Sequence, residues 1–237
     1  MKKILITSGG TREYIDEVRV LTNISSGKLG SLIADQFSIF NGPYSVSHKC
    51  NLYEVHFVYV KGSLKPFFEG DDVILHEVTD VKSVYDIMEK LVPEMDVVIH
   101  PMAVSDFGFT PIKTKLKSND PEGFIQSMKE RIYQTPKILS HIKEWNPNCF
   151  LISFKFENEL TRDELLFSAE ESMKKNGSDI VIANDKSEMK KLGVHKAYVI
   201  RKEPVPTYGV YGRLDCELNG KDEIARKIFK IVNELND

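Results

Sequence analysis

The chain has 237 residues, of which 41% are hydrophobic and 28% charged, and its formal net charge is −3. That length can bury a substantial core, and the charge balance excludes a general nucleic-acid-binding protein, which would be strongly basic. Three scattered cysteines without a CxxC pair exclude a disulfide framework and a cysteine zinc site. Because no apolar run approaches the ~18 residues that span a bilayer and the amino terminus lacks a signal-peptide core, we expect a soluble, cytoplasmic protein without membrane contact.

Short apolar runs predict buried strands at residues 3–7, 55–61, 72–77, 96–100, 150–154, 179–183 and 196–202. Apolar residues at helical spacing predict helices at residues 27–40, 81–92, 162–175 and 222–235. Residues 107–122 lack a clear period, and a mobile loop is predicted there. Because strands and helices alternate, we predict one α/β domain over residues 1–237. Its sheet is expected to be Rossmann-like, doubly wound and mostly parallel, with helices on both faces.

In a doubly wound sheet, ligands bind beyond the carboxyl ends of the strands, so the loops that follow strands are candidate sites. The loop after the first predicted strand has adjacent Gly9 and Gly10 and does not match the GxGxxG dinucleotide fingerprint. Gly27-Lys28 is followed by leucine, where a Walker A motif requires serine or threonine. Residues 23–30 still combine two hydroxyls, glycine and lysine at a predicted helix start. They can form an anion cradle, although a capped helix is the commoner explanation of such a segment taken alone.

The amino-terminal segment is more specific as a whole than in its parts. Residues 8–30 read SGGTREYIDEVRVLTNISSGKLG and resemble the signature of the phosphopantothenate–cysteine ligase family. Four further pieces follow in the family's order: AVSDF at 103–107, KLK at 115–117, TPKIL at 135–139 and IAND at 182–185. The chain is therefore identified as a member of this family.

The resemblance implies a ligase of coenzyme A synthesis. The carboxylate of 4′-phosphopantothenate would attack the α-phosphate of a nucleoside triphosphate, giving an acyl-nucleotide and pyrophosphate, and the amine of L-cysteine would then displace the nucleoside monophosphate. Such chemistry depends on positioning and charge stabilisation rather than on a nucleophilic side chain. We expect CTP with Mg²⁺, with ATP as the open alternative, and no metal ligands in the chain itself.

The family also implies a homodimer with shared active sites. Because the ligase's first strand is predicted at the amino terminus, we expect the stand-alone form, with the flavin-dependent decarboxylase as a separate chain. Arg19 is expected to reach the substrate of the neighbouring subunit. Residues 11–22 are mostly polar and are predicted to lie outside any helix or strand, so they would be ordered more easily against a partner.

Individual roles are carried over from the family. Asn23 is expected to hydrogen-bond the acyl intermediate and Lys115, in a lysine cluster, to meet the triphosphate, so these two are the implied catalytic residues. The implied substrate-binding residues are Arg19, Asn23, Ser25, Ser26, Gly27, Lys28, Ala103 and Asp106. The implied nucleotide-binding residues are Gly9, Gly10, Asp106, Lys115, Pro136, Lys137, Ile138, Leu139, Phe154 and one of Lys174 and Lys175.

Three stretches depart from the family pattern. At 153–158 the sequence SFKFEN replaces the family's small residues. The basic residue expected just before the strand at 179–183 falls on Asn176, so one of the two preceding lysines is given its role. Residues 42–54 are interpreted as a polar, lineage-specific loop.

Two other function classes fit parts of the sequence. An NAD(P)-dependent short-chain oxidoreductase needs Tyr-x-x-x-Lys on a helix, but Tyr198 and Lys202 fall on a predicted strand, where they would lie ~13 Å apart. The glycine fingerprint of that class is also missing. A non-catalytic nucleotide-binding partner of the decarboxylase would tolerate loss of Asn23 or Lys115, and both are present.

Overall fold

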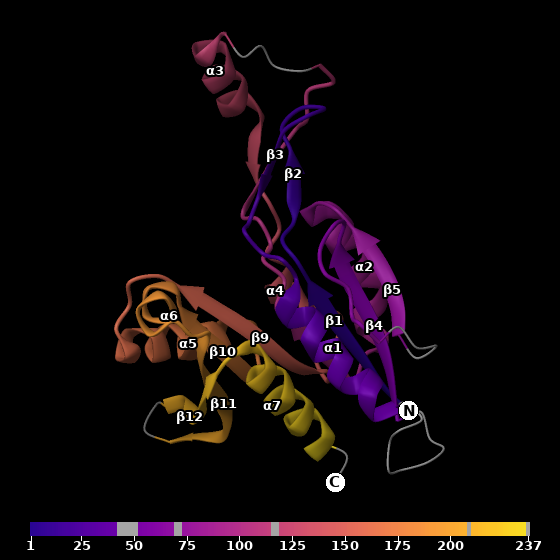
Figure 1. The fold of residues 1–237 in the computed structure, drawn as a ribbon, viewed down its shortest axis with the longest axis vertical. Helices are drawn as coiled ribbons and strands as arrows, with labels where there is room; N and C mark the ends of the chain where they lie inside the picture. Colours follow the sequence, from indigo (N-terminus) through magenta and orange to yellow (C-terminus); the bar gives the residue numbers. More distant parts are fainter. Residues whose placement is uncertain (42–51, 69–72, 115–118, 208–209, 236–237) are drawn as a thin grey trace.

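The computed structural model describes residues 1–41, 52–68, 73–114, 119–207 and 210–235. Its centre is an eight-stranded sheet with the order β12-β11-β10-β9-β6-β1-β4-β5 (Figure 1). The strands of this sheet are β1 (Lys2–Ser8), β4 (Tyr53–Val60), β5 (Val73–Val78), β6 (Val97–His100), β9 (Phe150–Glu157), β10 (Ile180–Asp185), β11 (Lys196–Thr207) and β12 (Val210–Asn219). From β5 to β10 neighbouring strands are parallel, and β11 and β12 add antiparallel pairs. The predicted Rossmann-like α/β fold is confirmed.

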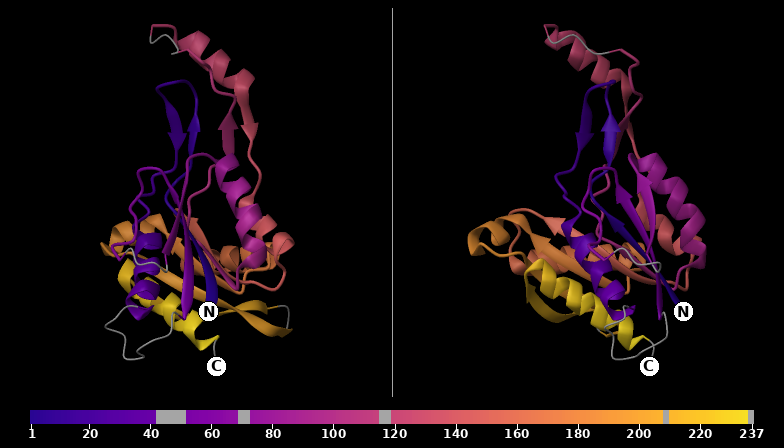
Figure 2. Two further views of the ribbon diagram at one scale, coloured as in Figure 1. Left: turned by 90° about the vertical axis from the view of Figure 1, so that its right-hand side faces the viewer. Right: turned by 45° about the vertical axis from the view of Figure 1, so that its right-hand side comes forward.

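Helices cover both faces of the sheet (Figure 2). They are α1 (Lys28–Asn41), α2 (Val81–Leu91), α4 (Ile138–Trp145), α5 (Arg162–Asn176), α6 (Lys186–Leu192) and α7 (Lys221–Glu234), with the short 3₁₀-helix η1 (Val92–Glu94) after α2. Ile4 and Ile6 of β1 pack in the cluster under α1 and α7, whereas Leu5 packs in the cluster under α2 and α4. This division follows from the alternation of side chains along a strand. α5 packs on β10 and β11. Among the described residues, no helix has the length and apolarity to cross a membrane.

Two antiparallel strand pairs extend from the carboxyl edge of the sheet, one of them with a helix between its strands, and we call them the arm (Figures 1 and 2). The arm comprises β2 (Arg12–Tyr14), β3 (Val20–Thr22), β7 (Phe107–Phe109), α3 (Pro121–Arg131) and β8 (Ile132–Gln134). The Ile112 N–H donates to the Ile15 carbonyl at 3.1 Å and joins the two pairs. At the base of the arm, the buried Glu13 carboxylate accepts the Val81 N–H of α2 at 2.9 Å. The arm is thereby attached to the rim of the sheet.

The arm corrects two expectations. Residues 11–22 were expected outside any strand, yet they form the β2–β3 hairpin. Residues 107–122 were predicted as a loop, yet their described part contains β7 and the start of α3. Strands of three residues are too short to show a period in the sequence. Of the predicted 42–54 loop, residues 42–51 lie outside the described residues.

The start of α1 lies directly against the end of β1. A β-carbon on Gly30 would lie 2.6 Å from Ser8 Oγ and 3.0 Å from the Thr7 carbonyl oxygen. Gly27 has a φ of +77°, and Ser8 Oγ donates to its carbonyl at 2.9 Å. The helix approaches the strand this closely because both positions lack a side chain.

Gly30→Ala is expected to lower the free energy of unfolding by about 1–3 kcal/mol, because the new methyl group overlaps the end of β1. In an open helix the same change would stabilise the protein by about 1 kcal/mol. Urea denaturation measures the difference, with Gln36→Ala in the same helix as the control. A gain in stability for Gly30→Ala would contradict the observed packing.

Candidate functional site

The direction of strand crossover changes between β1 and β6. From β1 the chain continues to β4 and β5 on one side, and from β6 it continues to β9 and β10 on the other. In an open parallel sheet, such a point leaves a crevice at the carboxyl ends of the two strands, where ligands bind. The loops that follow β1 and β6 are therefore the candidate site.

These two loops, residues 8–11 and 101–106, are bonded to each other, and we call them the loop junction. The Ala103 N–H donates to the Gly9 carbonyl at 2.9 Å, and the Thr11 N–H donates to the Ala103 carbonyl at 3.1 Å. The Ser105 N–H donates to Oγ1 of the buried Thr11 at 2.9 Å. The junction is thus a backbone pairing that continues past the ends of the strands.

Asn23 lies on the loop junction. Its Nδ2 donates to the Ala103 carbonyl at 3.3 Å, while its side chain is exposed. Gly10 packs against the Asn23 carbonyl, where a β-carbon would approach to 2.6 Å. One amide N–H of Asn23 is therefore fixed on the protein, and its second N–H and its Oδ1 are available to a ligand.

A cleft of about 490 Å³ opens beside the junction, at the starts of α1 and α7. The expected site residues that line it are Gly9, Ser25, Ser26, Gly27, Lys28, Ala103 and Phe154. Lining residues that sequence analysis did not assign include Phe156, Asn184, Met189, His195 and Lys221. Gly220-Lys221 repeats, at the start of α7, the Gly-Lys pair at the start of α1. That repetition is a signal that could have identified Lys221.

The charged side chains that line the cleft are all positive. Lys28 and Lys221 are its lysines, and its lining includes no aspartate or glutamate. Neither lysine pairs with a carboxylate of a described residue. At the start of α1, the Lys28 N–H donates to Ser26 Oγ at 3.3 Å. The lysines and the helix start together favour an anionic ligand.

Comparison with known proteins decides the family. The model of the DNA/pantothenate metabolism flavoprotein C-terminal domain matches residues 1–235. The chain belongs to this family. The resemblance seen in the sequence is thereby confirmed at the level of the flavoprotein C-terminal domain, whose fold carries the loop junction and the cleft.

Relatives and a solved structure agree with the assignment. The coenzyme A biosynthesis bifunctional proteins CoaBC of Thermococcus kodakarensis and Methanocaldococcus jannaschii are 35% and 31% identical, over 77% and 98% of this chain. The aligned regions span 41% and 51% of those proteins, so the chain covers about half their length or less. The DNA/pantothenate metabolism flavoprotein from Streptococcus pneumoniae has a TM-score of 0.79 at 30% identity, covering 99% of this chain and all of that one.

Other residues implied by the family, Asp106 and Pro136 to Leu139, lie in the loop junction or are attached to it but do not line the cleft. Lys137 Nζ is 2.5 Å from Asp106 Oδ1, and both side chains are exposed. The Thr135 N–H donates to the Asp106 carbonyl at 3.1 Å, so residues 135–139 are attached to the junction. Ile138, the first residue of α4, is buried in the cluster that α4 shares with α2. Only the backbone of Ile138 is therefore available to a ligand.

Arg19 lies in the arm and does not line the cleft of its own chain. Its Nη1 is 2.6 Å from Oδ2 of Asp16, which is buried. Its guanidinium carbon lies 5.8 Å from the centre of the Phe124 ring of α3. Arg19 therefore contacts other residues of the arm, whereas the carbonyl of Ala103 accepts the hydrogen bond from Asn23.

The structure does not bring Lys174 and Lys175 to the cleft. Both lie in the last turn of α5, which ends near the amino end of β10, whereas the cleft lies at the carboxyl edge. The Asp179 N–H, just before β10, donates to the carbonyl of Leu151 near the start of β9, at that opposite edge. Lys115 lies outside the described residues.

The oxidoreductase alternative is not supported by the position of its residues. Tyr198 and Lys202 both lie on β11, as the sequence predicts. The Tyr198 hydroxyl donates to Glu188 at 2.7 Å. Burial, reinforced by that carboxylate, raises the pKa of Tyr198 to about 12. A tyrosine held protonated in this way is unsuited to the proton transfer that the alternative requires.

A buried pair, Thr7 and His100, lies at the ends of β1 and β6, directly before the loop junction. Thr7 Oγ1 lies 2.8 Å from His100 Nδ1 and accepts the Met102 N–H at 3.3 Å. Burial lowers the pKa of His100 to about 4, so the ring is neutral near pH 7. Because Met102 precedes Ala103, the pair helps to fix the carbonyl on which Asn23 is bonded.

We expect His100 to make the protein acid-sensitive. Its pKa in the folded state is about 4, below the ordinary value of 6.5. The contribution of His100 to the free energy of unfolding is therefore complete above pH 6.5 and is lost as the pH falls towards 4. The loss is about 3 kcal/mol. Urea denaturation between pH 7 and pH 4 should show a steeper fall for the wild type than for His100→Gln, and parallel curves would contradict this account.

Proposed function

We propose that this chain is a phosphopantothenate–cysteine ligase that uses CTP and forms an acyl-cytidylate intermediate. The observation that carries the proposal is the amide of Asn23, fixed on the Ala103 carbonyl at the edge of a cleft whose charged lining is positive. The family and the coenzyme A biosynthesis relatives support it. The activity is proposed for the chain itself, which matches about half the length of those bifunctional relatives or less.

In the first step, a carboxylate oxygen of 4′-phosphopantothenate bonds to the α-phosphorus of CTP, and the bond to the pyrophosphate oxygen breaks. Both reactants are anions, so bringing them together requires positive charge and hydrogen-bond donors. The free N–H of Asn23 and the ammonium of Lys28 would supply these beside the loop junction. The fixed position of the Asn23 amide reduces the reorganisation that the reaction needs.

In the second step, the amine of cysteine attacks the acyl carbon, and CMP leaves with its oxygen as the amine loses a proton. The acyl oxygen gains negative charge during the attack. A preorganised amide donor such as Asn23 stabilises that charge. Loss of a single donor of this kind commonly slows a reaction about 100-fold or more.

Mg²⁺ would enter with the nucleotide. The described residues contain no cluster of histidine, cysteine, aspartate or glutamate suited to a metal ion. Mg²⁺ commonly keeps several waters and binds through substrate phosphates, so phosphate oxygens fit its needs here. When bound, the ion would neutralise charge on the departing pyrophosphate.

The direct test is pyrophosphate release from purified protein with Mg²⁺, 4′-phosphopantothenate and cysteine. CTP should give steady release and CMP, and omission of cysteine should leave at most one equivalent per site. Equal turnover without any pantothenate compound would contradict the ligase function. A clear preference for ATP would contradict only the choice of nucleotide.

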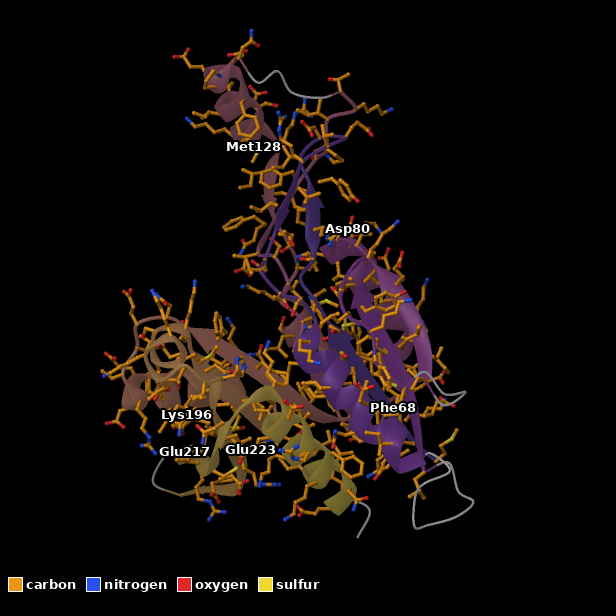
Figure 3. All side chains as sticks on the ribbon, viewed as in Figure 1. Phe68, Asp80, Met128, Lys196, Glu217 and Glu223 are labelled. Atoms are coloured by element: carbon orange, nitrogen blue, oxygen red, sulfur yellow. The ribbon has the colours of Figure 1, made fainter. Side chains whose placement is uncertain are left out.

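We further propose that the arm forms a homodimer in which Arg19 completes the neighbour's site. The arm exposes several large apolar side chains, among them Val18, Leu21, Phe107 and Ile125. Figure 3 shows the side chains of the arm, up to Met128 in α3, standing away from the sheet. Such an exposed apolar surface is typical of an interface, and a two-fold axis would pair two arms.

Complementation tests the shared site. Arg19→Gln keeps an amide donor for Asp16, and Asn23→Ala removes the donor on the junction; each should be nearly inactive alone. Half of randomly reassociated dimers are mixed, and each mixed dimer would hold one intact site. Activity should therefore recover to roughly a quarter of the wild type. If size exclusion confirms exchanged dimers but no activity returns, Arg19 acts within its own chain.

A further inference from the structure

His195 and Lys221 line the cleft together with the start of α1, and the sequence indicates no role for either residue. His195 lies between α6 and β11, and Lys221 is the first residue of α7. We call these two residues the basic corner. They come from segments that meet only in the folded chain, at the same carboxyl edge of the sheet as the loop junction.

Backbone hydrogen bonds hold the basic corner together. The Gly220 N–H donates to the His195 carbonyl at 2.9 Å, which joins the start of α7 to the segment before β11. The Asn184 side chain, buried at the end of β10, donates to the Lys196 carbonyl at 2.5 Å. Gly220 has a φ of +105°, a conformation that residues with side chains rarely adopt. The corner is therefore placed by the fold rather than by a flexible loop.

The corner brings two basic groups together, and none of the described residues that line the cleft is a carboxylate. Lys221 pairs with no carboxylate of a described residue, and the His195 ring makes no hydrogen bond to one. Burial and the nearby Lys221 lower the pKa of His195. Glu223, labelled in Figure 3 in the first turn of α7, is outside the lining and accepts the Asn219 N–H at 2.6 Å.

We propose that the basic corner binds a phosphate group of one of the substrates. A phosphate accepts hydrogen bonds from an ammonium and an imidazole together, and its charge offsets their mutual repulsion. Lys28 lines the same cleft from α1 and adds a second ammonium group to its lining. This inference rests on the proposed function, because both 4′-phosphopantothenate and CTP carry the required phosphate chemistry. It adds His195 and Lys221 to that site as specificity residues.

The test follows the ring proton signal of His195 by NMR as the pH is varied. The protein is examined alone and with pyrophosphate, 4′-phosphopantothenate or CTP, and His195→Asn assigns the signal. The phosphate that occupies the corner should raise the pKa of His195 by about one unit. The signal of His76, which is on β5 and lines neither pocket, is the internal control and should stay unchanged.

Steady-state kinetics identifies the source of the phosphate. Lys221→Met should raise KM about 10- to 100-fold for the substrate whose phosphate is held there, with little change in kcat. Lys230→Met, in the same helix and paired with Glu234, should leave KM unchanged. A selective effect on 4′-phosphopantothenate assigns the corner to its phosphomonoester, and a selective effect on CTP assigns it to the triphosphate; either supports the proposal.

If none of the three compounds changes the pKa of His195 in protein that turns over its substrates, the proposal that the basic corner binds phosphate is wrong. Equal KM values for Lys221→Met and Lys230→Met would also contradict it. A response to pyrophosphate in protein that makes no phosphopantothenoylcysteine would instead reject the ligase function and leave the phosphate site standing.

Discussion

The hydrogen bonds between the loops after β1 and β6 constrain the whole candidate site. Ala103 donates to Gly9 and accepts from Thr11, so the two loops continue the pairing of their strands beyond the sheet. This pairing fixes the carbonyl that holds Asn23, and the arm begins directly after Thr11 with β2. Ala103 of the junction lines the cleft, and Asp106 binds the segment from Thr135 to Leu139. Both sides depend on the same few backbone contacts.

The charges that line the cleft favour an anionic ligand. The whole chain has more acidic than basic residues, yet the charged residues lining the cleft are lysines. Two carboxylates next to, or paired with a neighbour of, lining residues have structural partners. Asp185, which follows Asn184, accepts the Glu188 N–H of α6, and Glu217 pairs with Arg162 and with Lys196, which follows His195. Because these carboxylates are engaged elsewhere, the positive potential of the cleft is left for an anionic ligand.

The sequence predicts the parallel core and the start of α1 well, because buried strands and amphipathic helices have clear periods. It misses the arm, whose strands have three residues each, although Arg19 does lie between β2 and β3, outside regular structure, as expected. It also misses His195 and Lys221, because residues separated by a strand hairpin meet only through the pairing of β11 with β12. Lys174 and Lys175 are candidates from local alignment alone, and only the topology shows that α5 ends at the opposite edge of the sheet.

We propose that the acyl group reacts at Asn23 on the loop junction. A crystal structure with bound 4′-phosphopantothenate tests it most directly. The account predicts density for the substrate's carboxylate within hydrogen-bond distance of the Asn23 amide, with the rest of the molecule extending along the junction. A second pocket, of about 360 Å³, is lined by Tyr85, Tyr133 and His141. Substrate bound there, with Asn23 uncontacted, would contradict the account.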